Sequence, residues 1–122
     1  GCAQLERVPD MLARKRVLAE RYAEAFDRID GVSFLREPEG TVSNYWLCTL
    51  ILDADRAGDQ EALLGALNDA DLMARPVWTL MHCLPMFADM PRADLSCAED
   101  LAGRVVNVPS SPNLAGPAKA SA

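Results

Sequence analysis

Hydrophobic residues near the start of the chain recur three or four positions apart. The series consists of Leu5, Val8, Leu12, Leu18, Tyr22, Phe26 and Ile29. This spacing places the side chains on one face of an α-helix, so the pattern predicts a long amphipathic helix over residues 4–29. Pro9 has no amide donor and should kink this helix or begin its second segment, whereas Gly31 favours its termination.

Four segments have the composition of β-strands: 32–35, 44–52, 72–75 and 105–108. The segment 44–52 is apolar on both alternating faces, which is typical of a strand in a sheet that is covered on each side. We expect Tyr45 and Trp46 to lie in the core and Cys48 to be a small core residue.

Two shorter helices are predicted from capping signals. Asp59 can cap a helix that runs to about Ala70, with three leucines turned inward. These are Leu63, Leu64 and Leu67. Ser96 and Glu99 have the spacing of a capping box, which predicts a helix that ends at Gly103.

The segment 77–94 has no sustained hydrophobic period, which predicts a long ordered loop that can include one helical turn. Ordered loops of this length tend to carry function. Residues 113–122 are small and polar, and we expect them to form a disordered tail. The order of elements predicts a two-layer α/β (α+β) domain over residues 1–112, with a long N-terminal helix and a small mixed or antiparallel sheet.

Composition narrows the classes of function. The net charge of −6 opposes binding to nucleic acid, and the longest apolar run, residues 46–52, is too short to cross a membrane. The four cysteines lack paired spacing and His82 is the only histidine, so a structural zinc site is not expected. Reduced thiols in the cytoplasm are the expected state.

The sequence ARPVWTLMHCLPMF at residues 74–87 contains most of the candidate chemistry. Arg75 offers a planar fork for a carboxylate or phosphate, Trp78 a stacking face, and His82 a donor or acceptor near neutral pH. The methionines and Phe87 are better interpreted as loop packing, and Arg75 and His82 are open to both interpretations. Asn44, before a predicted strand, either reaches a cleft or bonds its own backbone in a turn.

A self-contained enzyme is hard to assemble from this chain. It has no nucleophile elbow, phosphate-binding glycine loop or metal-spaced carboxylate set. A Schiff-base lysine needs a desolvated pocket, and neither Lys15, among charges on a helix, nor Lys119, in the tail, fits that need. A cysteine hydrolase that uses Cys83 with His82 is disfavoured, because adjacent strand residues point to opposite faces. We therefore predict no catalytic, cofactor-binding or metal-binding residue.

Several motifs resemble a known family. GCAQLERVPDMLARKRVLAERY is similar to the start of the small domain of DegT/DnrJ/EryC1/StrS aminotransferases, where GxAQLE leads a helix with a KR pair and a closing RY. SNYWL, ARPVWTLMHCLPMF and DLSCAEDLAGRVVNVPSS resemble the branch that aminates 4-keto-6-deoxy sugar nucleotides, particularly in legionaminic acid and related bacterial surface-sugar pathways. The resemblance covers residues 1–114.

The resemblance implies the C-terminal small domain of a fold-type-I aminotransferase. In such an enzyme pyridoxal phosphate carries the chemistry, glutamate donates the amino group and a keto sugar nucleotide accepts it. It implies that the Schiff-base lysine lies on a large N-terminal domain that this chain lacks, so no cofactor is expected on this chain alone. The positions that match substrate-facing motifs are Asn44, Trp46, Arg75, Trp78 and His82. A homo-oligomer is also expected.

Two further expectations follow. Because the chain begins with Gly1 in a sequence typical of a helix interior, we expect it to be cut from a longer protein. The alternative is a free-standing α/β module that binds a ligand or partner through the loop from Arg75 to His82. If the first helix normally packs on an absent domain, its apolar face should drive self-association.

Overall fold

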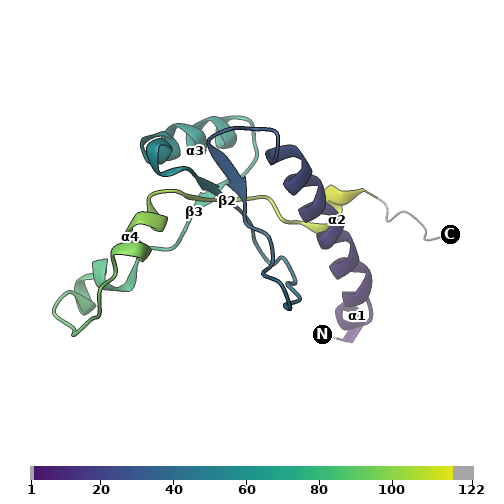
Figure 1. The fold of residues 1–122 in the computed structure, drawn as a ribbon. Coiled ribbons are helices and arrows are strands. Elements are labelled where there is room, and N and C mark those ends of the chain that lie inside the picture. Colours follow the sequence, from purple (N-terminus) through teal and green to yellow (C-terminus); the bar gives the residue numbers. More distant parts are fainter. Residues whose placement is uncertain (1, 117–122) are drawn as a thin grey trace.

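A computed structural model describes residues 2–116. Its helices are α1 (Cys2–Leu5), α2 (Val8–Phe26), α3 (Gln60–Asp69) and α4 (Ser96–Ala102). Its strands are β1 (Val32–Phe34), β2 (Cys48–Leu52), β3 (Arg75–Pro76) and β4 (Val105–Val108). Figure 1 shows α2 and α3 against the sheet, and the segment that includes α4 projecting away from α2.

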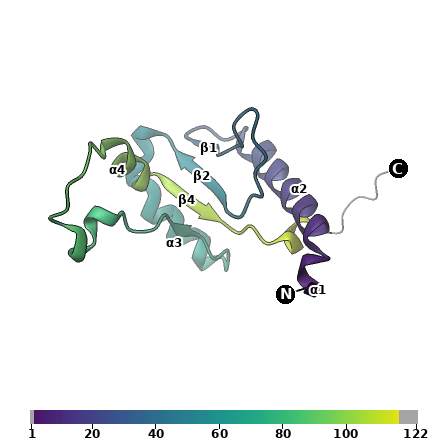
Figure 2. The same cartoon turned by 90° about the horizontal axis from the view of Figure 1, so that it is seen from below.

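The four strands form one antiparallel sheet in the order β1-β2-β4-β3. Figure 2 shows β2 and β4 side by side at its centre, where Leu50 lies opposite Val106 and Cys48 opposite Val108. Pro76 pairs with Val106 on the edge strand β3, a position where the missing amide of proline is tolerated. The predicted two-layer α/β (α+β) class is confirmed, and the sheet is antiparallel rather than mixed.

The core lies between one face of the sheet and the two longer helices. Ala19 and Ala23 of α2 pack with the buried Cys48, Leu50 and Val106 of the sheet. The leucines of α3 cover the same cluster and are partly buried, as predicted: Leu63, Leu64 and Leu67. The small side chains of these alanines allow α2 to pack closely on the sheet.

The opposite face of the sheet differs from the prediction. Thr49 and Ile51 of β2 are only half-buried, whereas Val105, paired with Ile51, is buried, so this side is covered in part rather than fully as expected. The Thr49 hydroxyl donates to Asn107 Oδ1 at 2.8 Å, and Asn107 Nδ2 donates to the Pro76 carbonyl at 3.3 Å. Polar side chains therefore link β2, β4 and β3 on this face.

The first predicted helix is divided near its start. The turn at residues 6–7 separates α1 from α2, and Pro9 lies in the first turn of α2, where the absent amide costs no hydrogen bond. The helix ends at Phe26 rather than Ile29, and Gly31 follows with φ of 86°. This left-handed conformation suits glycine.

Two predicted strands are shorter than expected. The segment 44–47 is irregular because Tyr45 has φ of 44°, so β2 begins at Cys48. Asp71 and Met73 have φ of 59° and 24°, which is incompatible with an extended segment over residues 72–75. Only the end of that segment, at Arg75, enters the sheet.

Both predicted capping interactions are wrong. Asp59 has helical backbone angles and ends a 3₁₀ helix at Ala54–Asp59 that runs into α3, and its side chain makes no capping bond. Ser96 lies inside α4, and Asp94 Oδ1 accepts from its backbone amide at 3.1 Å. Several carboxylate or hydroxyl side chains lie near the first turn of each helix, and any of them can accept a hydrogen bond from its free backbone amides. Sequence spacing alone therefore does not show which side chain makes the capping bond.

The loop between β3 and α4 is ordered by two 3₁₀ turns, Met81–Cys83 and Pro85–Phe87. The predicted tail at 113–122 falls partly outside the described residues, which end at 116. Within them, Pro112–Ala115 form a 3₁₀ turn, and Arg21 Nη1 donates to the carbonyl of the buried Ala115 at 2.8 Å. The expected disorder is therefore wrong for residues 113–115.

Candidate functional site

Two tryptophans from distant segments stack on the surface. Trp46 precedes β2 and Trp78 follows β3, and their ring centroids are 5.9 Å apart with planes inclined by 27°. The side chains remain 66% and 69% exposed, so the prediction that Trp46 lies in the core is wrong. Large aromatic faces left open to solvent in this way are suited to contact with another molecule.

A groove of about 490 Å³ lies beside this stack. Its lining includes Trp78 and Arg75, together with Asn107 of β4 and Ser110, which follows β4. Arg75 stands opposite Asn107 in the β3–β4 register and is exposed. Within residues 2–116 no acidic side chain forms an ion pair with Arg75. Its guanidinium is therefore available for a carboxylate or phosphate.

Asn44 adopts the turn role rather than reaching into the groove. Its Oδ1 accepts a hydrogen bond from the Trp46 backbone amide at 2.9 Å, the bond that defines an Asx turn. The intervening Tyr45 is half-buried, and its ring packs on Phe34 with centroids 6.3 Å apart. Asn44 and Tyr45 thus shape the chain that presents Trp46.

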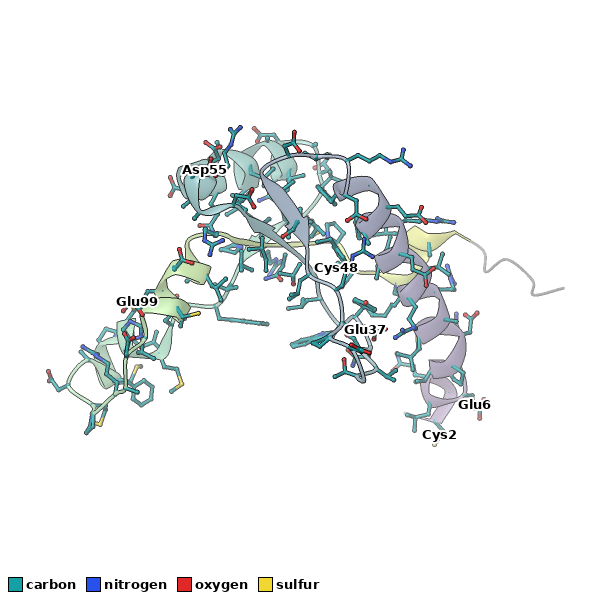
Figure 3. All side chains as sticks on the ribbon, in the orientation of Figure 1. Cys2, Glu6, Glu37, Cys48, Asp55 and Glu99 are labelled. Carbon is teal, nitrogen blue, oxygen red and sulfur yellow. The ribbon has the colours of Figure 1, made fainter. Side chains whose placement is uncertain are left out.

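His82 lies on the other side of Trp78. Its Nε2 is 2.8 Å from Glu99 Oε1, and its side chain is only 14% exposed. It lines a cavity of about 400 Å³ with Trp78, Cys83 and Glu99, separate from the groove that contains Arg75. Figure 3 shows Glu99 in the projecting part of the molecule.

The hydrolase hypothesis gains no support from this geometry. Cys83 and His82 line the same cavity, but no hydrogen bond joins them in the described part of the chain. A catalytic pair requires the base within hydrogen-bond reach of the nucleophile. His82 instead fastens α4 to the loop before it.

The comparison with protein families agrees with the sequence motifs. The model of the DegT/DnrJ/EryC1/StrS aminotransferase family matches residues 1–120. The chain belongs to this family. Its Lys15–Arg16 pair and residues 74–87, which carry the resemblance in sequence, therefore lie in a family domain.

Two relatives of this family member are similar over nearly the whole chain. It is 34% identical to EpsN of Bacillus subtilis, named as a pyridoxal phosphate-dependent aminotransferase, over 93% of this chain and 30% of EpsN. It is 31% identical to the GDP-perosamine synthase of Vibrio cholerae, over 93% of this chain and 31% of that enzyme. The chain thus spans less than a third of the length of these relatives.

Solved structures of the family share the fold. The aminotransferase TlmJ of Streptoalloteichus hindustanus superposes with a TM-score of 0.81 at 25% identity, over 92% of this chain and 29% of TlmJ. The expected aminotransferase small-domain fold is therefore confirmed.

Because EpsN is named as a pyridoxal phosphate-dependent enzyme, we ask whether a lysine of this chain could bind that cofactor. Lys15 is more buried than its sequence context indicated, and desolvation lowers its pKa. Its Nζ donates to the Ser110 carbonyl at 2.5 Å and lies 3.5 Å from the Trp46 carbonyl oxygen. An amine engaged in this way does not fit the role of a Schiff-base lysine. The other lysine, Lys119, lies outside the described residues.

Other kinds of site are not indicated within residues 2–116. No group of three metal-ligating side chains is present there, and none of the described helices is long and apolar enough to span a bilayer. Cys48 is buried as predicted, and burial raises the pKa of its thiol. The groove and the exposed tryptophans are therefore the features best suited to bind a ligand.

The sequence missed three contributors to this site: Lys15, Asn107 and Ser110. All three lie in family motifs, Lys15 in the KR pair and Asn107 and Ser110 in the NVPSS segment. Neither motif indicates that the helix near the start of the chain contacts the segment near its end. That contact results from long-range packing, which the sequence pattern does not report.

Proposed function

We propose that this chain is the C-terminal small domain of a pyridoxal-phosphate-dependent aminotransferase that transfers an amino group from glutamate to a 4-keto-6-deoxy sugar nucleotide. The observation that carries the proposal is the groove formed by Arg75 and Trp78 in a chain of the aminotransferase family. It offers one cation for a phosphate or carboxylate next to an aromatic face for a ring. A nucleotide-linked sugar presents both features.

The proposed role of this chain is to bind and orient substrate. Arg75 supplies positive charge at the edge strand, and the Trp46–Trp78 stack supplies an apolar wall beside it. When bound in the longer protein, the cofactor would supply the electron sink for amino transfer. Described residues of this chain offer no lysine suited to hold it, so we assign no step of that chemistry to them.

The proposal includes the biological setting expected from the motifs. The substrate belongs to bacterial surface polysaccharide biosynthesis, and the enzyme acts as a cytoplasmic homo-oligomer. The exposed Leu5 and Leu12 on the first two helices support a partner surface, because an apolar stripe open to water favours association. The similarity to GDP-perosamine synthase supports a nucleotide-linked sugar as substrate.

The test compares the chain alone with the longer polypeptide encoded by its reading frame. Mixed with pyridoxal phosphate, glutamate and a 4-keto-6-deoxy sugar nucleotide, the 122-residue chain should neither retain cofactor absorbance on gel filtration nor form amino sugar. The longer polypeptide should do both. Amino transfer by the chain alone would contradict the proposal, and a start codon close to Gly1 would favour a free-standing binding module instead.

A further inference from the structure

Lys15 connects three segments that are far apart in sequence. From the middle of α2, its ammonium donates to the Ser110 carbonyl at 2.5 Å. The same nitrogen lies 3.5 Å from the Trp46 carbonyl oxygen, at the limit of a hydrogen bond. Ser110 Oγ donates to that Trp46 carbonyl at 2.6 Å. The backbone of Trp46 is thus held by Lys15 through Ser110.

These bonds occur where the central ladder of the sheet stops. The β2–β4 register ends with Cys48 opposite Val108, and continuing it by two residues would place Trp46 opposite Ser110. Pro109 intervenes and has no amide to donate, while the positive φ of Tyr45 turns the other strand away. Side chains therefore replace the backbone pairing that would otherwise hold Trp46 at this point.

Neighbouring residues of α2 secure the same C-terminal segment without reaching the tryptophan. Tyr22 Oη donates to the Pro109 carbonyl at 3.0 Å, and Arg21 Nη1 donates to the Ala115 carbonyl at 2.8 Å. Both bonds fix the segment that follows β4. Among these donors only Lys15 also approaches the backbone of Trp46, so loss of its ammonium should affect the tryptophan more than the fold.

The partial burial of Lys15 makes the hydrogen bonds of its ammonium energetically important. Its side chain is partly buried, and desolvation lowers its pKa. A partly buried cation is retained at a cost unless polar atoms compensate it, and here two carbonyl oxygens face it. Hydrogen bonds from a charged group are stronger than those between neutral groups.

We propose that Lys15 is a positioning residue that, together with Ser110, holds the Trp46 indole against Trp78 and so fixes the wall of the groove next to Arg75. The consequence for substrate binding rests on the proposed function. The conformational claim does not, because it concerns the two indoles in this chain without substrate.

The two stacked indoles provide a direct readout. Trp46 and Trp78 are the two tryptophans of the chain, and two indoles in close contact give a coupled, bisignate circular dichroism band. Trp78→Phe should abolish this band in the 122-residue chain and thereby assign it. Lys15→Met keeps the length of the side chain without the charge and should lose most of the band, whereas Lys15→Arg should keep most of it.

Two further variants make the test decisive. Arg28→Met removes an exposed cation on the turn after α2 and should leave the band unchanged. Ser110→Ala removes the direct bond to Trp46 and should lose part of the band, even if Lys15→Met does not fold. Far-ultraviolet circular dichroism checks the fold of each variant. A native band in folded Lys15→Met, or an unchanged band in Ser110→Ala, would overturn the proposal.

A kinetic experiment separates this proposal from the proposed function. In the longer polypeptide, Lys15→Met should raise KM for the sugar nucleotide by roughly tenfold, the equivalent of one charge-assisted hydrogen bond lost indirectly, with KM for glutamate unchanged. If the band is lost but KM stays unchanged, Lys15 positions the indoles and the groove is not the sugar-nucleotide site. If the band survives, the positioning role fails and the aminotransferase assignment still stands.

Discussion

The two parts of this molecule are held together in different ways. The body, residues 2–76 and 103–116, contains every buried hydrophobic residue of the described part of the chain, including Leu50 and Val106 at 1% and 0% exposure. The arm, residues 77–102, contains none that is buried. It is ordered by 3₁₀ turns, the His82–Glu99 pair and the Trp46–Trp78 stack. Figure 1 shows it extending away from α2.

This difference separates the part of the chain that stabilises the fold from the part that borders the candidate binding surface. Burial of apolar surface dominates the stability of a small domain, so the body can specify its own shape. In the arm, Met81, Met86 and Met90 are 64%, 66% and 56% exposed. Its conformation rests on local turns and a few side-chain contacts. The candidate groove lies where the arm leaves the body.

The largest expected effect comes from the core of the body. Leu50→Ala should lower the free energy of unfolding by about 2–5 kcal/mol, because it removes buried methyl groups and leaves a cavity. In the arm, Met86→Ala should change it by less than about 0.5 kcal/mol, because the side chain is already exposed. Urea denaturation followed by circular dichroism measures both. Similar losses in the two variants would contradict the division into body and arm.

A smaller effect is expected from the ion pair that anchors residues 35–43 to α2. Arg16 pairs with Glu37, which also accepts from the Ser43 amide at 2.6 Å, and these bonds lower the pKa of Glu37 below its usual 4.5. A carboxylate with a lowered folded pKa stabilises the protein above its unfolded pKa and loses that contribution as the pH falls through the folded value.

Glu37→Gln should therefore be less stable than the native chain at pH 7, and the difference should shrink as the pH falls below 4.5. Thermal unfolding at several pH values measures this dependence. Glu24→Gln, on the exposed side of α2, provides the matched control and should run parallel to the native chain. A stability difference for Glu37→Gln that stays constant down to about pH 3, well below the usual pKa of a glutamate side chain, would rule out this coupling.

The body was largely predictable from sequence, whereas the ends of its elements were not. The spacing from Leu5 to Phe26 and the apolar runs at Leu50 and Val106 report directly on burial, so they indicate helix and sheet. The late start of β2, at Cys48 rather than Asn44, depends on the positive φ of Tyr45. That conformation results from the Asx turn of Asn44 and the packing of the Tyr45 ring on Phe34. A turn hydrogen bond and a single ring contact leave no periodic pattern of hydrophobic residues in the sequence, so they could not be predicted from it.

The candidate site was predictable only in its residue types. Arg75, Trp78 and His82 are close in sequence, yet Arg75 and His82 line different cavities on either side of Trp78. Trp46 was expected in the core because it is apolar and precedes a buried strand. Its exposure follows from the turn that directs it to Trp78, and Lys15 was missed because its partners, Trp46 and Ser110, are distant in sequence.

The most direct test of the account is the effect of Arg75→Ala on substrate binding in the longer polypeptide. Loss of a charge-assisted bond to phosphate or carboxylate should cost about 1.5–3 kcal/mol, which is roughly a ten- to hundredfold rise in KM for the 4-keto-6-deoxy sugar nucleotide. Because Arg75 is exposed, unfolding should be unchanged. The account predicts that rise with native stability and unaltered cofactor absorbance. An unchanged KM for the sugar nucleotide in the stable variant would contradict it.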